Sequence, residues 1–212
     1  MLAGRADEVA DYLLWGAEGT LPRSSHIDME LASQTDPFSA YRINMGNIEQ
    51  VRRSSLRALG RLHARVSPDH RESIDTHLIA ASRDASPIVR QGVAMALDAI
   101  EGDVVLPTRL LLKLVVLLHD PDPKPCSWAC VSAGHLIARG LANPFAEDLI
   151  ERLFNLAETA PVVEVRVGVA VGLRALTQID WLGTASRQRV LAALAALSSD
   201  VSFRVRREAA VA

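Results

Sequence analysis

The sequence predicts an all-α fold, a right-handed α-α superhelix in which about five helix pairs stack side by side as a solenoid. Three observations lead to this prediction. A Val-Arg dipeptide recurs at a nearly constant interval along the chain. Small and apolar residues around each copy follow the period of an α-helix. The 212 residues are 49% hydrophobic but only 4% aromatic, and the Ala, Leu and Val among them favour closely packed helices.

The repeat is anchored by Val-Arg dipeptides that begin at Val51, Val89, Val165 and Val205. The first two anchors are 38 residues apart and the last two are 40 apart. The gap between the second and third is 76 residues, which is two periods of 38. A degenerate fifth copy is therefore expected near residue 127, where Cys126 takes the place of the valine and Ser127 that of the arginine.

Each copy is expected to form two helices. In its second half, small or apolar residues stand at offsets 0, 3, 4, 7, 8 and 11 from the anchor, which places them on one helical face. Prolines at positions 68, 87, 144 and 161 mark helix starts, where their missing N–H group is not needed. The predicted organisation is a capping helix and loop at 1–23, then a repeat array at 24–212, divided into 24–66, 67–102, 103–141, 142–180 and an incomplete 181–212.

The pattern Asp-x-x-x-x-Val-Arg followed by Ala-Leu resembles the second half of a HEAT (armadillo-like) repeat, and the resemblance covers residues 24–212. It implies a ladder of polar contacts between adjacent repeats, formed by Asp84, Arg90, Asp200 and Arg206. From the residues alone, such an aspartate can cap a helix, while the guanidinium can reach the aspartate of a neighbouring unit. The other copies depart from the pattern, and the third lacks both partners, so we expect the ladder to be broken there.

In a solenoid the second helix of each pair should line the concave side, with offsets 2, 6, 9 and 10 facing solvent. This rule selects a partner-binding surface that consists of Arg53, Arg57, Arg61, Met95, Trp128, His135, Val171 and Arg174. The three arginines, four residues apart on one face, would bind phosphate or an acidic peptide; the alternative is an ordinary solvated face. Trp128 would be an anchor for a partner, or else it packs against the next repeat.

Other chemical sites are weakly indicated. Cys126 and Cys130 share a helix face near His119 and His135, which could form a metal site, but two small buried hydrophobes explain them better. HEAT-like deoxyhypusine hydroxylases depend on His-Glu pairs, and the sequence has no such dipeptide. It also has no Gly-rich phosphate loop and no nucleophile elbow. We therefore expect no catalytic residues, no metal and no cofactor.

Charge and hydropathy indicate what the protein can bind and where in the cell it acts. The net charge is -2, which gives no general attraction to nucleic acid or to an anionic membrane. The longest apolar stretch, residues 110–119, is interrupted by Lys113 and is far shorter than the roughly 20 residues that span a bilayer. The chain has only two cysteines, and no signal peptide is evident, so we expect a cytoplasmic protein.

The expected function is that of a non-catalytic interaction scaffold, which binds a protein partner, or the remainder of a larger chain, on its concave face. Self-association through the C-terminal end, where the last repeat lacks a polar cap, is a further expectation. The alternative is a HEAT-like DNA-binding protein or an alkylpurine DNA glycosylase. That resemblance implies a cleft with Trp128, Trp181 and Asp180, flanked by the arginines of residues 53–61.

Overall fold

The computed structural model of the chain describes residues 2–19, 48–102, 104–179 and 182–210. Within these residues the secondary structure is ten helices and no strand, so the all-α prediction is confirmed. The chain divides into two compact units, Met1–Val104 and Val105–Ala212. No helix among the described residues combines the length and the hydropathy needed to cross a membrane.

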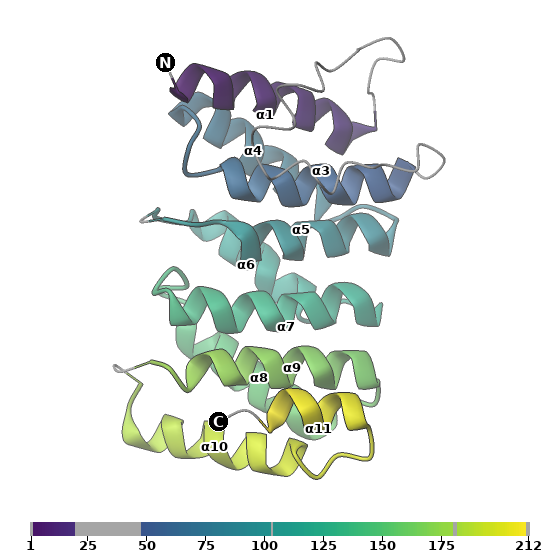
Figure 1. Cartoon of the computed structure of the whole chain (residues 1–212), viewed down its shortest axis with the longest axis vertical. Helices are drawn as coiled ribbons and strands as arrows, with labels where there is room; N and C mark the ends of the chain where they lie inside the picture. Colours follow the sequence, from purple (N-terminus) through teal and green to yellow (C-terminus); the bar gives the residue numbers. More distant parts are fainter. Residues whose placement is uncertain (1, 20–47, 103, 180–181, 211–212) are drawn as a thin grey trace. The chain divides into compact units, whose positions relative to one another are not determined.

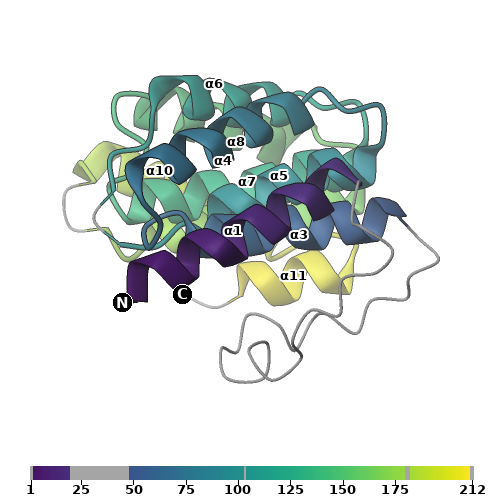
Figure 2. The same cartoon turned by 90° about the horizontal axis from the view of Figure 1, so that it is seen from above.

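Unit 1 is built from α1 (Leu2–Glu18), α3 (Ile48–Leu62), α4 (Pro68–Ala81) and α5 (Pro87–Ala99). Helices α1, α3 and α5 lie side by side in one layer, and α4 lies in a second layer behind them (Figures 1 and 2). The pair α4/α5 falls inside the range 67–102 expected for one repeat. Helix α3 occupies the second half of the range 24–66, whose first half, up to residue 47, lies outside the described residues.

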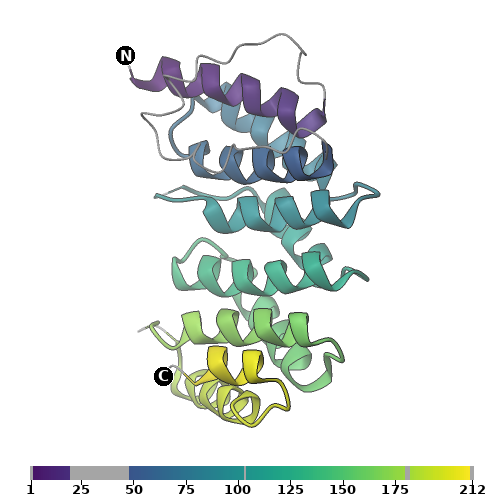
Figure 3. The ribbon, with the colours of Figure 1, turned by 45° about the vertical axis from the view of Figure 1, so that its right-hand side comes forward.

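Unit 2 contains α6 (Thr108–Leu117), α7 (Pro123–Ala138), α8 (Ala146–Thr159), α9 (Val163–Leu176), α10 (Thr184–Leu197) and α11 (Phe203–Ala209). Helices α7, α9 and α11 follow one another in one layer, and α6, α8 and α10 form the other (Figures 1 and 3). The pairs α6/α7, α8/α9 and α10/α11 each lie within one of the residue ranges expected for the last three repeats.

Helix starts follow local chemistry. Pro68, Pro87 and Pro123 each occupy the first turn of a helix. The side chain of Asp122 accepts a hydrogen bond of 2.9 Å from the backbone N–H of Lys124, and Ser67 caps α4 in the same way at 3.5 Å. These residues satisfy N–H groups that have no partner inside the helix.

Glycines let neighbouring helices within each unit approach closely. A Cβ atom built on Gly60 of α3 would lie 2.2 Å from the carbonyl oxygen of Ala96 in α5. In unit 2, a Cβ atom on Gly134 of α7 would lie 2.2 Å from the carbonyl oxygen of Gly172 in α9. The small residues found at the inner repeat positions therefore set how close these helices come within each unit.

Candidate partner-binding surfaces

In unit 1, an arginine and an aspartate connect two successive repeats. Arg52 of α3 donates from Nη2 to Oδ2 of Asp84 at 2.7 Å, and from Nε to the carbonyl oxygen of Ala17 at 2.7 Å. Asp84 also accepts from the backbone N–H of Ser86 at 2.9 Å, just before α5. Arg90, the arginine of the same copy, donates to the main-chain oxygen of Asp84 at 2.9 Å. Asp84 therefore pairs through its carboxylate with the arginine of the preceding copy.

Unit 2 repeats this arrangement. Arg166 of α9 donates from Nε and Nη2 to the two carboxylate oxygens of Asp200, at 2.6 and 3.2 Å. Its Nη1 atom donates to the carbonyl oxygens of Ala160 and Pro161 in the turn before its own helix. The hydrogen bond with Arg166 holds the pKa of Asp200 below its ordinary value, and that of Arg166 is raised by the same contact. Arg206 donates to the main-chain oxygen of Asp200 at 2.7 Å.

Two residues that take part in these contacts, Arg52 and Arg166, are not in the predicted ladder of Asp84, Arg90, Asp200 and Arg206. Arg52 and Arg166 stand in copies that lack the aspartate, and they supply the guanidinium groups that bind Asp84 and Asp200. Their shared Val-Arg dipeptide was the signal that could have identified them. In the third copy, Ser127 stands in place of the arginine and donates instead to the carbonyl oxygen of Glu164 at 2.7 Å.

Acid is expected to weaken the contact between α9 and α11 through Asp200. Its pKa is lowered in the folded chain, so its stabilising effect is present above the ordinary value of 3.8 and is lost as the pH falls through the folded-state pKa. Urea unfolding of the wild type and of Asp200→Asn should differ by a constant free energy between about pH 5 and 7. The difference should shrink below about pH 4. A difference that stays constant down to about pH 2 would contradict this role.

The predicted arginine row is present on one helix of unit 1. Arg57 is exposed, whereas Arg53 and Arg61 are half-buried. Burial lowers the pKa of Arg53, and the nearby charge of Arg57 lowers it further. Arg53 packs against α5, because a Cβ atom on Gly92 would lie 3.1 Å from Cγ of Arg53. None of the three arginines has a hydrogen bond or an ion pair with any residue that the structure describes.

The other predicted surface residues have more varied surroundings. Met95 is only 9% exposed, so the expectation that it faces solvent is wrong. Ser132, at the same offset in α7, is also fully buried, which shows that this offset turns toward packed neighbours in both helices. Trp128, His135 and Val171 are half-buried. Arg174 binds Oε2 of Glu208 at 3.3 Å and so connects α9 to α11. Asp180 and Trp181 lie outside the described residues.

The two cysteines are buried in α7 and are not in a disulfide. A hydrogen bond from Cys130 lowers the pKa of the Cys126 thiol, while burial raises the pKa of Cys130 well above its ordinary value. Cys126 itself donates to the carbonyl oxygen of Leu118 at 3.4 Å. Within the described part of the chain, no group of three or more His, Cys, Asp or Glu residues could hold a metal ion.

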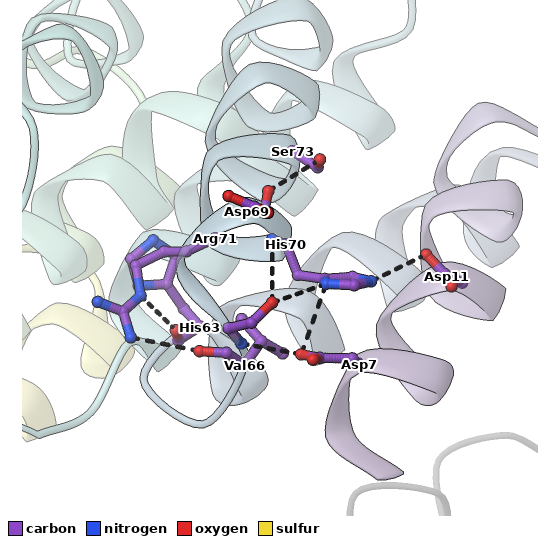
Figure 4. A network of polar contacts seen from close by, with 9 residues as sticks. Asp7, Asp11, His63, Val66, Asp69, His70, Arg71 and Ser73 are labelled. Carbon is purple, nitrogen blue, oxygen red and sulfur yellow. Dashed lines mark hydrogen bonds and ion pairs between the residues drawn. The ribbon is translucent and has the colours of Figure 1, made fainter. Parts of the chain in front are cut away.

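A polar network between α1 and α4 was not predicted (Figure 4). His70 lies 3.6 Å from Asp7 and 3.3 Å from Asp11, and the Asp7 carboxylate also accepts from the backbone N–H of Ser67 at 2.8 Å. Two helical turns further along α4, Nε2 of His77 lies 2.7 Å from Oε1 of Glu18. The seven-residue spacing of these histidines, matched by acidic residues on α1, was the available signal.

Unit 1 also contains a buried histidine-aspartate pair. Nε2 of His63 lies 2.8 Å from Oδ1 of Asp75, and both side chains are almost completely shielded from solvent. Nδ1 of His63 has no hydrogen-bond partner. Arg71 donates hydrogen bonds to the main-chain oxygens of His63 and Val66, in the connection between α3 and α4 (Figure 4). With a proton on Nε2, His63 donates a hydrogen bond to the carboxylate of Asp75. The pair thereby joins the end of α3 to α4 and has a structural role.

Comparison of the chain with models of known protein families, with curated proteins and with solved structures found no match.

Proposed function

We propose that the chain is a HEAT-type, right-handed solenoid that acts in the cytoplasm as a non-catalytic interaction scaffold, and that its arginine row binds an acidic segment of a partner protein. The architectural part of the proposal rests on the helix pairs of each unit and on the Arg52–Asp84 and Arg166–Asp200 contacts, which join successive repeats. Two free, buried cysteines are compatible with a reducing compartment.

The observation that carries the binding function is the row Arg53, Arg57 and Arg61. The backbone positions of the three arginines lie about 6 Å apart along the helix axis, and none of the arginines has a carboxylate partner among the described residues. Holding such charges together is unfavourable: burial has the larger effect in lowering the pKa of Arg53, and the nearby charge of Arg57 lowers it further. An acidic segment would relieve this repulsion, and carboxylates at every fourth residue of a helix would match the spacing.

A protein partner fits this surface better than a nucleic acid does. Duplex binding depends on many phosphate contacts spread over a broad positive surface. The whole chain carries a net charge of -2, and the row offers three arginines on one helix. A short acidic peptide needs no more than this.

The test is the affinity of the full chain for a fluorescent, helix-forming peptide with glutamates four residues apart, measured by anisotropy. Replacing Arg53, Arg57 and Arg61 together by glutamine should weaken binding by about tenfold or more, since each exposed charge pair contributes roughly 0.5 to 1 kcal/mol. Arg65→Gln, an exposed arginine of the same unit, is the matched control and should leave the affinity unchanged.

Two results would overturn the assignment. One is an equal loss of affinity in the Arg65→Gln control, which would show that only the overall charge matters. The other is tighter binding to a DNA duplex than to the peptide at the same ionic strength, which would favour the nucleic-acid alternative.

A further inference from the structure

One face of α11 is exposed to solvent where the equivalent face of α9 is packed against other residues. The two helices match position by position at an interval of 40 residues, as in Val165 and Val205. The inward positions are buried in both helices. Ala170, however, is fully buried in α9, whereas its counterpart Ala210 is exposed. The counterpart of half-buried Val163 is Phe203, which is 66% exposed.

Arg206 lies on this face and makes the same main-chain hydrogen bonds as Arg166. Both arginines donate from Nη1 to two carbonyl oxygens of the turn before their own helix. Arg166 uses its other two nitrogens to bind the carboxylate of Asp200. Among the described residues, no carboxylate accepts from the corresponding Nε and Nη2 atoms of Arg206. The Nε–Nη2 edge of Arg206 can therefore bind a carboxylate in the way that the same edge of Arg166 binds Asp200.

The surroundings of Arg206 combine apolar surface with positive charge. Val201, just before α11, is 90% exposed, and the guanidinium carbon of Arg206 lies 5.9 Å from the centre of the Phe203 ring. More than half of the Arg204 and Arg207 side chains is exposed, and each has one carboxylate neighbour, Glu164 at 3.8 Å and Glu208 at 2.6 Å. Exposed apolar side chains with basic residues beside them are typical of an interaction site for an acidic, apolar surface.

Helix α1 has such a surface. Its sequence contains four acidic residues and one arginine. Tyr12 and Trp15 are 41% and 44% exposed and contact each other edge to face, with ring centroids 5.5 Å apart. Glu8 and Asp11 are exposed beside them on the same helix. The face formed by these four residues is therefore acidic and aromatic, where the α11 face is basic and apolar.

We propose that the α11 face docks on the α1 face of a second copy of the chain. In this contact a carboxylate from Glu8 or Asp11 of the second copy occupies the Arg206 edge, and Phe203 packs against Tyr12. Two α11 faces would instead bring six arginines together, and two α1 faces would oppose carboxylates, so the charges favour a head-to-tail contact. Such a heterologous interface leaves the α1 face of one copy and the α11 face of the other unused, so further copies can add to them.

The test is a charge exchange, read as the weight-average mass in sedimentation equilibrium of the full chain in low-salt buffer. The wild type should gain mass with concentration. The double variant Arg204→Glu/Arg207→Glu should stay monomeric, and so should Glu8→Arg/Asp11→Arg, because each then opposes like charges. An equimolar mixture of the two variants should associate again, because the exchanged faces complement each other. Circular dichroism of each variant shows whether it is folded.

The proposal is overturned if the wild type stays monomeric over about a hundredfold range of concentration up to the millimolar level. It is also overturned if either variant alone associates like the wild type, or if the mixture of two folded variants stays monomeric. Glu101→Arg, an exposed acidic position in unit 1 outside α1, is the matched control and should associate like the wild type.

Discussion

Replacing Asp75 with alanine is expected to lower the free energy of unfolding by about 3 kcal/mol. The carboxylate is the partner of His63 Nε2 at 2.8 Å, and both side chains are buried. Because Nδ1 of His63 is already without a partner, the substitution would leave both ring nitrogens of a buried imidazole unsatisfied. A small cavity in place of the carboxylate adds to the loss. Urea unfolding followed by circular dichroism measures the change.

Two further variants separate the hydrogen bond from the helix in which it lies. Asp75→Asn keeps the shape and one acceptor oxygen, so it should be less damaging than Asp75→Ala. Thr76→Ala, at the exposed neighbouring position of α4, should change stability by no more than about 0.5 kcal/mol. If Asp75→Ala were as mild as Thr76→Ala, the buried pair would have no structural role.

Replacing Gly134 with alanine is expected to destabilise the chain by about 2 kcal/mol, although alanine is the better helix former by roughly 1 kcal/mol. The new methyl group would lie 2.2 Å from the carbonyl oxygen and 2.4 Å from the Cα atom of Gly172. These are backbone atoms of a packed helix, so α7 and α9 must move apart rather than one side chain turning away. Thermal and urea unfolding both report the change.

Gly183→Ala is the matched control, because nothing lies within 4 Å of a Cβ atom built there and the backbone is not in the left-handed region. This residue is the N-cap of α10, where alanine is less favourable than glycine, so its replacement should lower stability by no more than about 1 kcal/mol. Equal stability of Gly134→Ala and the wild type would show that the α7–α9 contact is loose enough to accept a methyl group.

The helices could be predicted from the sequence because the repeat supplies several independent signals for the same element. For α5, a serine-proline start, a periodic apolar stripe and the anchor Val89 all agree, and the helix runs from Pro87 to Ala99. The same periodicity cannot say which neighbour a side chain meets. Met95 was placed at the surface by its offset from Val89, yet it is buried.

Contacts between distant segments were harder to predict. The pairing of Arg52 with Asp84 joins two copies, and neither copy by itself contains both partners of the contact. The buried pair His63–Asp75 depends on how the turn between α3 and α4 is folded, which no single-helix pattern encodes. The division of the chain at Val104 and Val105 likewise has no counterpart in the regular interval of the anchors.

The bonds from ladder arginines to the turn before their own helix restrict how the repeats can diverge in length. Arg90 and Arg206 each hold main-chain oxygens five and six residues before them. One extra residue in that interval would rotate the guanidinium by about 100° around the helix and take it away from those oxygens. Insertions in the connection at 139–145, between α7 and α8, leave the interval unchanged. Related chains should therefore vary in length between their helix pairs while the turn inside each pair keeps its size.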